Sequence, residues 1–122
     1  MNNRIIVHVE DNYHNRRIVR KILLTQGYQI YEAEDGLGGL QMIKDVVPDL
    51  VLLDISLPGI DGLEIVGRLK ASEAYQNIPV IALTASAMVG DRERFLAAGC
   101  DDYLSKPVRA LTLIQRVNSY FT

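Results

Sequence analysis

The strongest constraint on the fold of this chain is a regular alternation between short apolar runs and longer segments with helical spacing. The short runs have the length and residue types of β-strands. They occupy residues 5–9, 29–33, 50–53, 80–84 and 103–104. Each is followed by apolar residues at the spacing of one helix face. Because strict alternation gives parallel strands joined by right-handed crossovers, the sequence predicts an α/β fold with a five-stranded parallel sheet.

Local signals predict where the helices begin and end. Gly27 and Pro48 are expected to close the first two helices, Asp61 to cap the third, and Gly99 to follow the fourth. Apolar helix faces are predicted at Ile18, Val19, Ile22 and Leu23, at Leu37, Leu40, Ile43 and Val47, at Ile65, Val66 and Leu69, at Phe95 and Ala98, and at Leu111, Ile114, Val117 and Phe121. The glycines at 36, 38 and 39 lack the Lys-Ser/Thr pair of a phosphate-binding loop, so they are interpreted as a flexible helix start.

Length and composition predict a single domain over residues 1–122. A chain of 122 residues that is 48% hydrophobic is large enough to bury one core, and its apolar pattern leaves little room for a second module at either end. About 120 residues accommodate five strand-helix pairs in an open, doubly wound sheet. The expected strand order is 2-1-3-4-5, the flavodoxin-like (βα)5 arrangement.

Charge and residue usage restrict the location and the partners. No apolar run approaches the roughly 20 residues that span a bilayer, and the first residues do not resemble a signal peptide. The single cysteine, Cys100, is expected to be a small packed residue. A net charge of −2 gives no general attraction to nucleic acid or anionic membranes. We therefore expect a cytoplasmic protein whose partners are other proteins.

Polar side chains stand where four of the predicted strands end. Glu10 and Asp11 follow the first strand, Asp54 ends the third, Thr84 ends the fourth, and Lys106 follows the fifth. The carboxyl ends of parallel strands share one edge of the sheet, and ligands bind there where the strand order reverses. With the order 2-1-3-4-5, the first and third strands are neighbours. The three carboxylates are then expected to converge.

Three carboxylates in a small cleft repel one another unless a cation compensates their charge. Magnesium suits such a site because it prefers oxygen ligands and keeps several waters, whereas calcium would need more ligands. Zinc would prefer His or Cys, and neither His8 nor His14 is placed to join the cluster. Lys106 and Thr84 offer the positive charge and the hydroxyl donor that would hold a tetrahedral anion on the metal. In that setting Asp54 can act as a nucleophile toward a phosphoryl group.

With these residues in this order, the sequence resembles the receiver domain of bacterial two-component response regulators, of the stand-alone kind that serves chemotaxis or cell division. The resemblance spans the whole chain, with its motifs in order and at family spacing. Those motifs are Val9-Glu10-Asp11-Asn12, the segment from Leu52 to Gly62, Ala82-Leu83-Thr84-Ala85, and Tyr103-Leu104-Ser105-Lys106-Pro107. Two residues depart from the commonest pattern: Leu57 replaces a frequent Met, and His8 replaces an aliphatic residue.

The resemblance implies a signalling phosphoacceptor and not an enzyme acting on an external substrate. Asp54 would take a phosphoryl group from a sensor histidine kinase or a histidine phosphotransfer protein, and only its own phosphorylation and slow dephosphorylation would be catalysed. The cofactor would be Mg²⁺, held directly by Asp11 and Asp54, through water by Glu10, and by the backbone carbonyl of Ser56.

The resemblance also implies a switch and an output surface. Thr84 and Lys106 would contact the phosphoryl group, and Thr84 and Tyr103 would move together to change the outer face. Residues from Ser86 through the fourth helix, with Tyr103 and the start of the last helix near Arg109, would bind a downstream target protein. A cis Lys106-Pro107 bond is expected, and it would aim the lysine into the cleft.

Two other functions fit parts of this pattern. Phosphatases of the haloacid dehalogenase type also use a nucleophilic aspartate at a strand end with magnesium, but they have a second Asp two positions later, where this chain has Ser56. An interaction module that has lost its chemistry would usually lack an acidic residue, the threonine or the lysine, and all of them are present. Tyr103 also fits a simple half-buried aromatic at a sheet edge.

Two further features have an ordinary structural interpretation. Arg16, Arg17, Arg20 and Lys21 lie opposite the apolar face of the first helix and are interpreted as a solvated surface, with docking of an acidic partner as the alternative. His8 is expected to be buried and satisfied within the fold, with a pH-sensitive role as the alternative.

Overall fold

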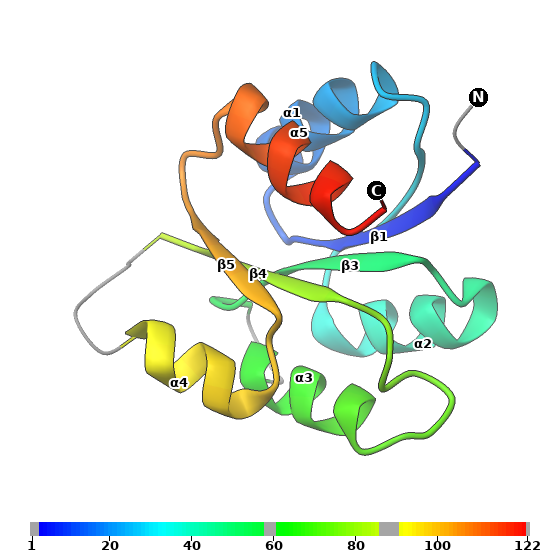
Figure 1. Cartoon of the computed structure of the whole chain (residues 1–122), viewed down its shortest axis with the longest axis vertical. Helices are drawn as coiled ribbons and strands as arrows, with labels where there is room; N and C mark the ends of the chain where they lie inside the picture. Colours follow the sequence, from blue (N-terminus) through cyan, green and yellow to red (C-terminus); the bar gives the residue numbers. More distant parts are fainter. Residues whose placement is uncertain (1–2, 58–60, 86–90, 122) are drawn as a thin grey trace.

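The computed structural model describes residues 3–57, 61–85 and 91–121 (Figure 1). The predicted turn at Pro58 and Gly59 and the start of the predicted output surface at Ser86 lie outside these ranges. The strands are β1 (Ile5–Val9), β2 (Gln29–Ala33), β3 (Leu50–Asp54), β4 (Val80–Thr84) and β5 (Asp102–Ser105). The helices are α1 (Tyr13–Leu24), α2 (Gly36–Val46), α3 (Gly62–Lys70), α4 (Asp91–Ala98) and α5 (Ala110–Ser119).

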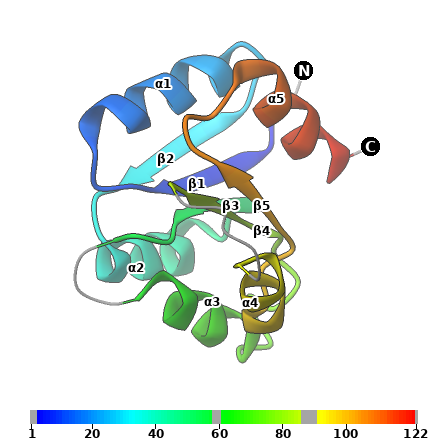
Figure 2. The same cartoon turned by 90° about the vertical axis from the view of Figure 1, so that its left-hand side faces the viewer.

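The strands form one parallel sheet in the order β2-β1-β3-β4-β5, which confirms the predicted topology. Helices α1 and α5 cover one face, and α2, α3 and α4 cover the other (Figure 2). Each face has its own apolar core, because successive strand residues point to opposite sides. Strands β3 and β4 are buried along their whole length, as expected for strands covered on both faces.

Several helix boundaries and faces differ from the predictions. Helix α1 ends at Leu24, so Gly27 lies in the following turn, with a φ of 83°, and does not cap the helix. Val47 is the left-handed cap of α2 and is 54% exposed, although it was expected on the apolar face. Phe121 lies beyond α5. The cap at Asp61 is confirmed, since its Oδ1 accepts a hydrogen bond from the Leu63 amide at 2.9 Å.

Besides Val47, three residues predicted on apolar helix faces are exposed. Ile18, Leu37 and Leu111 are 49%, 65% and 68% exposed. Ile18 precedes the buried Val19 on α1. Neighbouring helix residues point about 100° apart, so a helix that packs on a flat sheet buries only a narrow stripe. In the part of the chain that the structure describes, no helix is long and apolar enough to cross a membrane.

Gly39 allows α2 to pack closely against β1. A Cβ atom at Gly39 would lie 2.6 Å from Cγ2 of Val9, which is too close for two carbon atoms. The helix begins with Asp35 as its cap, whose Oδ1 accepts a hydrogen bond from the Gly38 amide at 2.6 Å. The predicted helix start is therefore confirmed, and Gly39 is a packing residue near the start of a capped helix.

His8 is fully buried in the middle of β1, pointing to the same face as Ile6. Among the described residues neither ring nitrogen has a hydrogen-bond partner, so the expectation of a satisfied histidine is wrong. Burial, assisted by the positive charge of Lys106, lowers the pKa of His8 from 6.5 to about 3. The ring is therefore neutral at physiological pH, and its protonation opposes folding.

We predict that His8 makes the fold sensitive to mild acid. The pKa of His8 is lower in the folded chain than in the unfolded chain. The free energy of unfolding is therefore unaffected by His8 above pH 6.5 and decreases as the pH falls from 6.5 toward 3. Between pH 7 and pH 5.5 the loss should be on the order of 1 kcal/mol, since the unfolded chain gains the proton first. Urea denaturation followed by circular dichroism at the two pH values measures it.

His8→Leu should remove most of this pH dependence. His14→Gln is the matched control, because His14 is exposed near the start of α1 and its replacement should leave the dependence unchanged. An equal slope in the wild-type and His8→Leu proteins would contradict the assignment.

Candidate functional site

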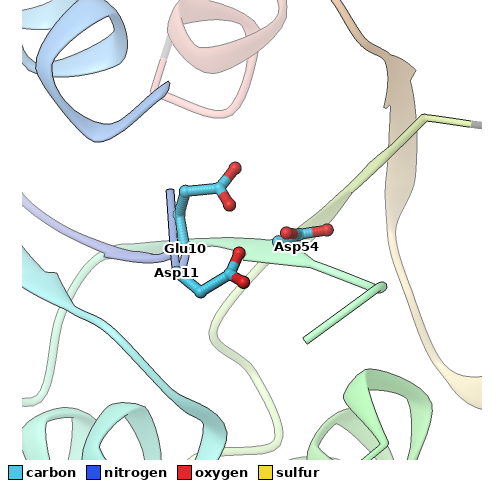
Figure 3. A group of neighbouring side chains, drawn as sticks. All are labelled: Glu10, Asp11 and Asp54. Atoms are coloured by element: carbon cyan, nitrogen blue, oxygen red, sulfur yellow. The ribbon is translucent and has the colours of Figure 1, made fainter. Parts of the chain in front are cut away.

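Three carboxylates converge at the carboxyl edge of the sheet. Glu10, Asp11 and Asp54 each offer an oxygen atom, and these atoms lie within 4.8 Å of one another (Figure 3). Glu10 and Asp11 follow β1, and Asp54 is the last residue of the neighbouring β3. Glu10 and Asp54 are buried, whereas Asp11 is exposed. The predicted convergence at the point where the strand order reverses is therefore confirmed.

Backbone groups orient the two buried carboxylates. Oδ1 of Asp54 accepts a hydrogen bond from the Ser56 amide at 2.9 Å, and Oε2 of Glu10 accepts one from the Asn12 amide at 3.3 Å. The Glu10 amide donates to the Ala33 carbonyl at 2.9 Å, which continues the β1-β2 ladder by one residue. Each carboxylate is thus held by the loop that follows its own strand.

Lys106, which follows β5, completes the charged cluster. Its Nζ atom lies 2.7 Å from Oε1 of Glu10 and 3.1 Å from Oδ2 of Asp54. The Lys106 amide donates to the Thr84 carbonyl at 2.8 Å, and the Lys106-Pro107 bond is cis, as predicted. The lysine therefore forms ion pairs with both buried carboxylates, in addition to the phosphoryl contact that the sequence suggested.

The buried pairing shifts the protonation equilibria of both partners. Burial raises the pKa of Glu10, and the nearby Asp54 raises it further, while the hydrogen bond from Lys106 opposes the change. Burial disfavours the charge on Lys106, but its bonds to Glu10 and Asp54 outweigh burial and raise the pKa of the lysine. Lys106 is therefore a permanent cation at this edge of the sheet.

The two predicted switch residues occupy adjacent strands. Thr84 ends β4 at the same edge as Asp54 and is 4% exposed. Tyr103 lies near the start of β5, paired in register with Ala82, so it stands away from the acidic cluster. Its half-buried ring packs against Phe95 of α4, with the ring centroids 5.9 Å apart. A coupled movement of Thr84 and Tyr103 stays a prediction.

Arg16 is part of the site, although it was interpreted as a solvated surface residue. Its Nη1 atom donates to the Glu10 carbonyl at 2.9 Å and to the Asp11 carbonyl at 3.1 Å, and its side chain is only 12% exposed. Arg17, Arg20 and Lys21 are exposed, as predicted. The usable signal in the sequence was its position, because a first-turn side chain of α1 reaches back to the loop that precedes the helix.

The fold is a doubly wound parallel sheet that is covered by helices on both faces and carries a charged cluster at the switch point. The pattern of response regulator receiver domains matches residues 6–118. The polar-differentiation response regulator DivK of Brucella ovis is 42% identical over 112 residues, which cover 92% of this chain and 91% of that protein. The chain therefore belongs to the response regulator receiver domains of two-component signalling.

Solved structures agree with this assignment. The receiver domain of the sensor histidine kinase PA1611 from Pseudomonas aeruginosa is 34% identical, with a TM-score of 0.88 over 98% of each chain, and it carries a magnesium ion coordinated in its active site cleft. The chemotaxis protein CheY4 of Vibrio cholerae has a TM-score of 0.91 at 24% identity, covering 98% of this chain and 99% of that one. The second likeness concerns the fold alone.

We predict that Lys106 stabilises the folded chain through the buried carboxylates. Lys106→Met would leave Glu10 and Asp54 close together without a compensating cation. Breaking a buried pair commonly destabilises by 3–5 kcal/mol, and because the lysine side chain is 18% exposed we expect about 2 kcal/mol. Urea denaturation in the presence of a chelator measures the effect.

Removing one of the two carboxylates left without a cation should restore part of the lost stability. We therefore expect Lys106→Met combined with Asp54→Asn to be more stable than Lys106→Met alone. Lys44→Met is the matched control, since Lys44 is exposed on α2, and its effect should stay below about 0.5 kcal/mol. Equal stability of the Lys106 and Lys44 variants would contradict the role.

Proposed function

We propose that Asp54 accepts a phosphoryl group and that its phosphorylation switches the contacts of this protein with another protein. The observation that carries the proposal is the place of Asp54 at the end of the central strand, with Oδ2 3.1 Å from the Lys106 ammonium and an acidic pair alongside. Glu10 is the poorer candidate, because Lys106 holds its carboxylate more closely, at 2.7 Å against 3.1 Å for Asp54. Asp11 is exposed and lacks the contact with Lys106.

The residues present fit a magnesium ion. Glu10, Asp11 and Asp54 supply hard oxygen ligands that converge within 4.8 Å, and the exposed Asp11 leaves the site open to solvent. We propose that Asp11 and Asp54 bind the ion directly, with the Ser56 carbonyl, and that Glu10 binds it through water. When bound, the ion would neutralise charge on the oxygens of the transferred group. The magnesium in the PA1611 receiver domain supports this choice of metal.

The reaction needs positioning and charge neutralisation more than acid-base chemistry. A carboxylate oxygen of Asp54 attacks the phosphorus of a phosphohistidine on a sensor histidine kinase or a histidine phosphotransfer protein. The P–N bond breaks and the imidazole leaves with its electron pair. Lys106 turns from the carboxylate to a phosphoryl oxygen, and the Thr84 hydroxyl donates to another. The donors that we propose act in the cytoplasm, which is where we place this protein.

The same site is poorly equipped for rapid turnover. Ser56 stands two residues after Asp54, at the position where phosphatases of the haloacid dehalogenase type have an aspartate. A serine hydroxyl is a weak general acid or base at neutral pH. The aspartyl phosphate would therefore persist long enough to be read by a partner. This supports a signalling phosphoacceptor over an enzyme that processes small substrates.

We predict that acetyl phosphate with magnesium adds one phosphoryl mass to the protein, measured by intact-mass spectrometry. Asp54→Asn should abolish the addition, because an amide is not a nucleophile at neutral pH. Asp45→Asn is the matched control: Asp45 is an exposed carboxylate on α2 that accepts a hydrogen bond from Gln41, and its variant should be labelled like the wild type. Labelling that persists in Asp54→Asn would refute the assignment.

We further propose that the output passes through α4, β5 and the start of α5. Thr84 is buried beside the phosphoacceptor, and Tyr103 on the next strand packs against Phe95 of α4. Movement of Thr84 toward a phosphoryl group would free space for the Tyr103 ring, which shifts the balance between two packed conformations. This face carries a pocket of about 360 Å³, lined by Arg92, Leu96, residues 101–105 and Arg116.

The output route predicts a specific pattern of chemical shifts. Beryllofluoride with magnesium should perturb amides in α4, around Tyr103 and near Arg109, besides those at the acidic cluster. A target that binds this face should gain about 1–3 kcal/mol of affinity on phosphorylation. Asp54→Asn is the control and should show none of these changes. Perturbations confined to the acidic cluster of the wild-type protein would argue against this route.

A further inference from the structure

Arg16 bonds the backbone of both residues that carry the first two carboxylates. One guanidinium nitrogen donates to the carbonyls of Glu10 and Asp11, at 2.9 and 3.1 Å. We propose that Arg16 is a positioning residue that fixes the acidic loop in its metal-binding conformation and thereby raises the affinity for Mg²⁺. This inference rests on the proposed function, because it assumes that the acidic cluster holds the ion.

The loop is short and is already held at both ends. The Glu10 amide donates to Ala33 in the sheet, and Asn12 caps α1 by accepting a hydrogen bond from the Asn15 amide at 3.0 Å. Between these points the two consecutive carbonyls of Glu10 and Asp11 both point to Arg16. Binding both carbonyls fixes the two peptide planes, and with them the directions in which the Glu10 and Asp11 side chains leave the backbone.

Asp11 depends on this restraint more than Glu10 does. The Glu10 carboxylate is fixed by Lys106 and by the Asn12 amide. The Asp11 carboxylate is exposed, and within the described ranges it has no hydrogen bond or ion pair of its own. Repulsion from Glu10 and Asp54 favours its movement away from the cluster. The carbonyl bonds from Arg16 are therefore the contacts that keep the backbone of Asp11 facing the site.

Charge and positioning predict opposite effects of removing the guanidinium. A cation close to the cluster repels Mg²⁺, so loss of charge alone should tighten metal binding. Loss of the carbonyl bonds should weaken binding, because the ion would then have to order the loop. Two further contacts contribute little, because their partners are exposed. Nη2 lies 3.5 Å from Glu34, whose side chain is 79% exposed. The guanidinium lies 5.7 Å from the centre of the ring of Tyr13, which is 63% exposed. The sign of the change in affinity therefore separates the two roles.

The test is calorimetric titration of Arg16→Gln with MgCl₂. We expect Mg²⁺ to bind roughly tenfold more weakly, the lower end of the range for residues that orient metal ligands. Arg16→Lys keeps the charge but loses the planar donor, so it should also bind more weakly. Arg17→Gln is the matched control: it removes the same charge from an exposed neighbour whose guanidinium donates a hydrogen bond to the Tyr13 hydroxyl, and it should bind as tightly as the wild type or more tightly.

A phosphorylation assay with acetyl phosphate gives the second measurement. The Mg²⁺ concentration for half-maximal rate should rise by the same factor in Arg16→Gln, while the rate at saturating Mg²⁺ stays near that of the wild type. General loss of structure would instead lower the saturating rate. The carbonyl ¹³C shifts of Glu10 and Asp11, recorded without metal, should change in Arg16→Gln and stay unchanged in Arg17→Gln.

The outcomes distinguish this inference from the proposed function. Unchanged or tighter Mg²⁺ binding in both Arg16 variants, with a phosphorylated wild type, overturns the positioning role alone. Weaker binding in the Arg16 variants, with no phosphorylation of the wild type, supports positioning and overturns the proposed function. A wild-type protein that binds no Mg²⁺ overturns both. If Arg16→Gln does not fold, Arg16→Lys decides, since affinity equal to the wild type would refute the need for the guanidinium.

Discussion

The structure depends on the balance of charge at one edge of the sheet. Two carboxylates, Glu10 and Asp54, are buried at the ends of adjacent strands, and such a pair is tolerated only with a cation between them. The cation comes from the far end of the chain, because the strand order places β5 two strands away from β3 and the Lys106 side chain reaches across the end of β4. The strand order, the burial of the two carboxylates and the charge of Lys106 therefore depend on one another at this edge.

Much of the fold and part of the site follow from short-range patterns. The buried β3 and the cap at Asp61 were predictable because each depends on residue type and spacing within a few positions. The strand order is a long-range property, and it was expected from the known arrangement of doubly wound sheets. The meeting of the acidic residues followed from the order of the strands alone. Their roles in metal binding and phosphoryl transfer follow from chemistry and family resemblance, and the experiments above address them.

Other features depend on which partner a side chain finds in three dimensions. Arg16 and Arg17 look alike in the sequence, yet one bonds the acidic loop and the other faces solvent. His8 was expected to be satisfied, but it is fully buried, and among the described residues neither ring nitrogen has a hydrogen-bond partner. Gly39 resembled a flexible residue, while its role is set by the approach of α2 to β1. For His8 and Gly39 no local pattern encodes these choices, and for Arg16 the local signal is its place in the first turn of α1.

The contact between Gly39 and Val9 has a consequence for how related chains can vary. Val9 directly precedes Glu10, so any shift of β1 that makes room for a larger residue in α2 also displaces the acidic pair. A side chain gained at position 39 is tolerable only if volume is lost at position 9, as in an exchange of Gly-Val for Ala-Ala. The two positions should therefore change together among related chains that keep the chemistry.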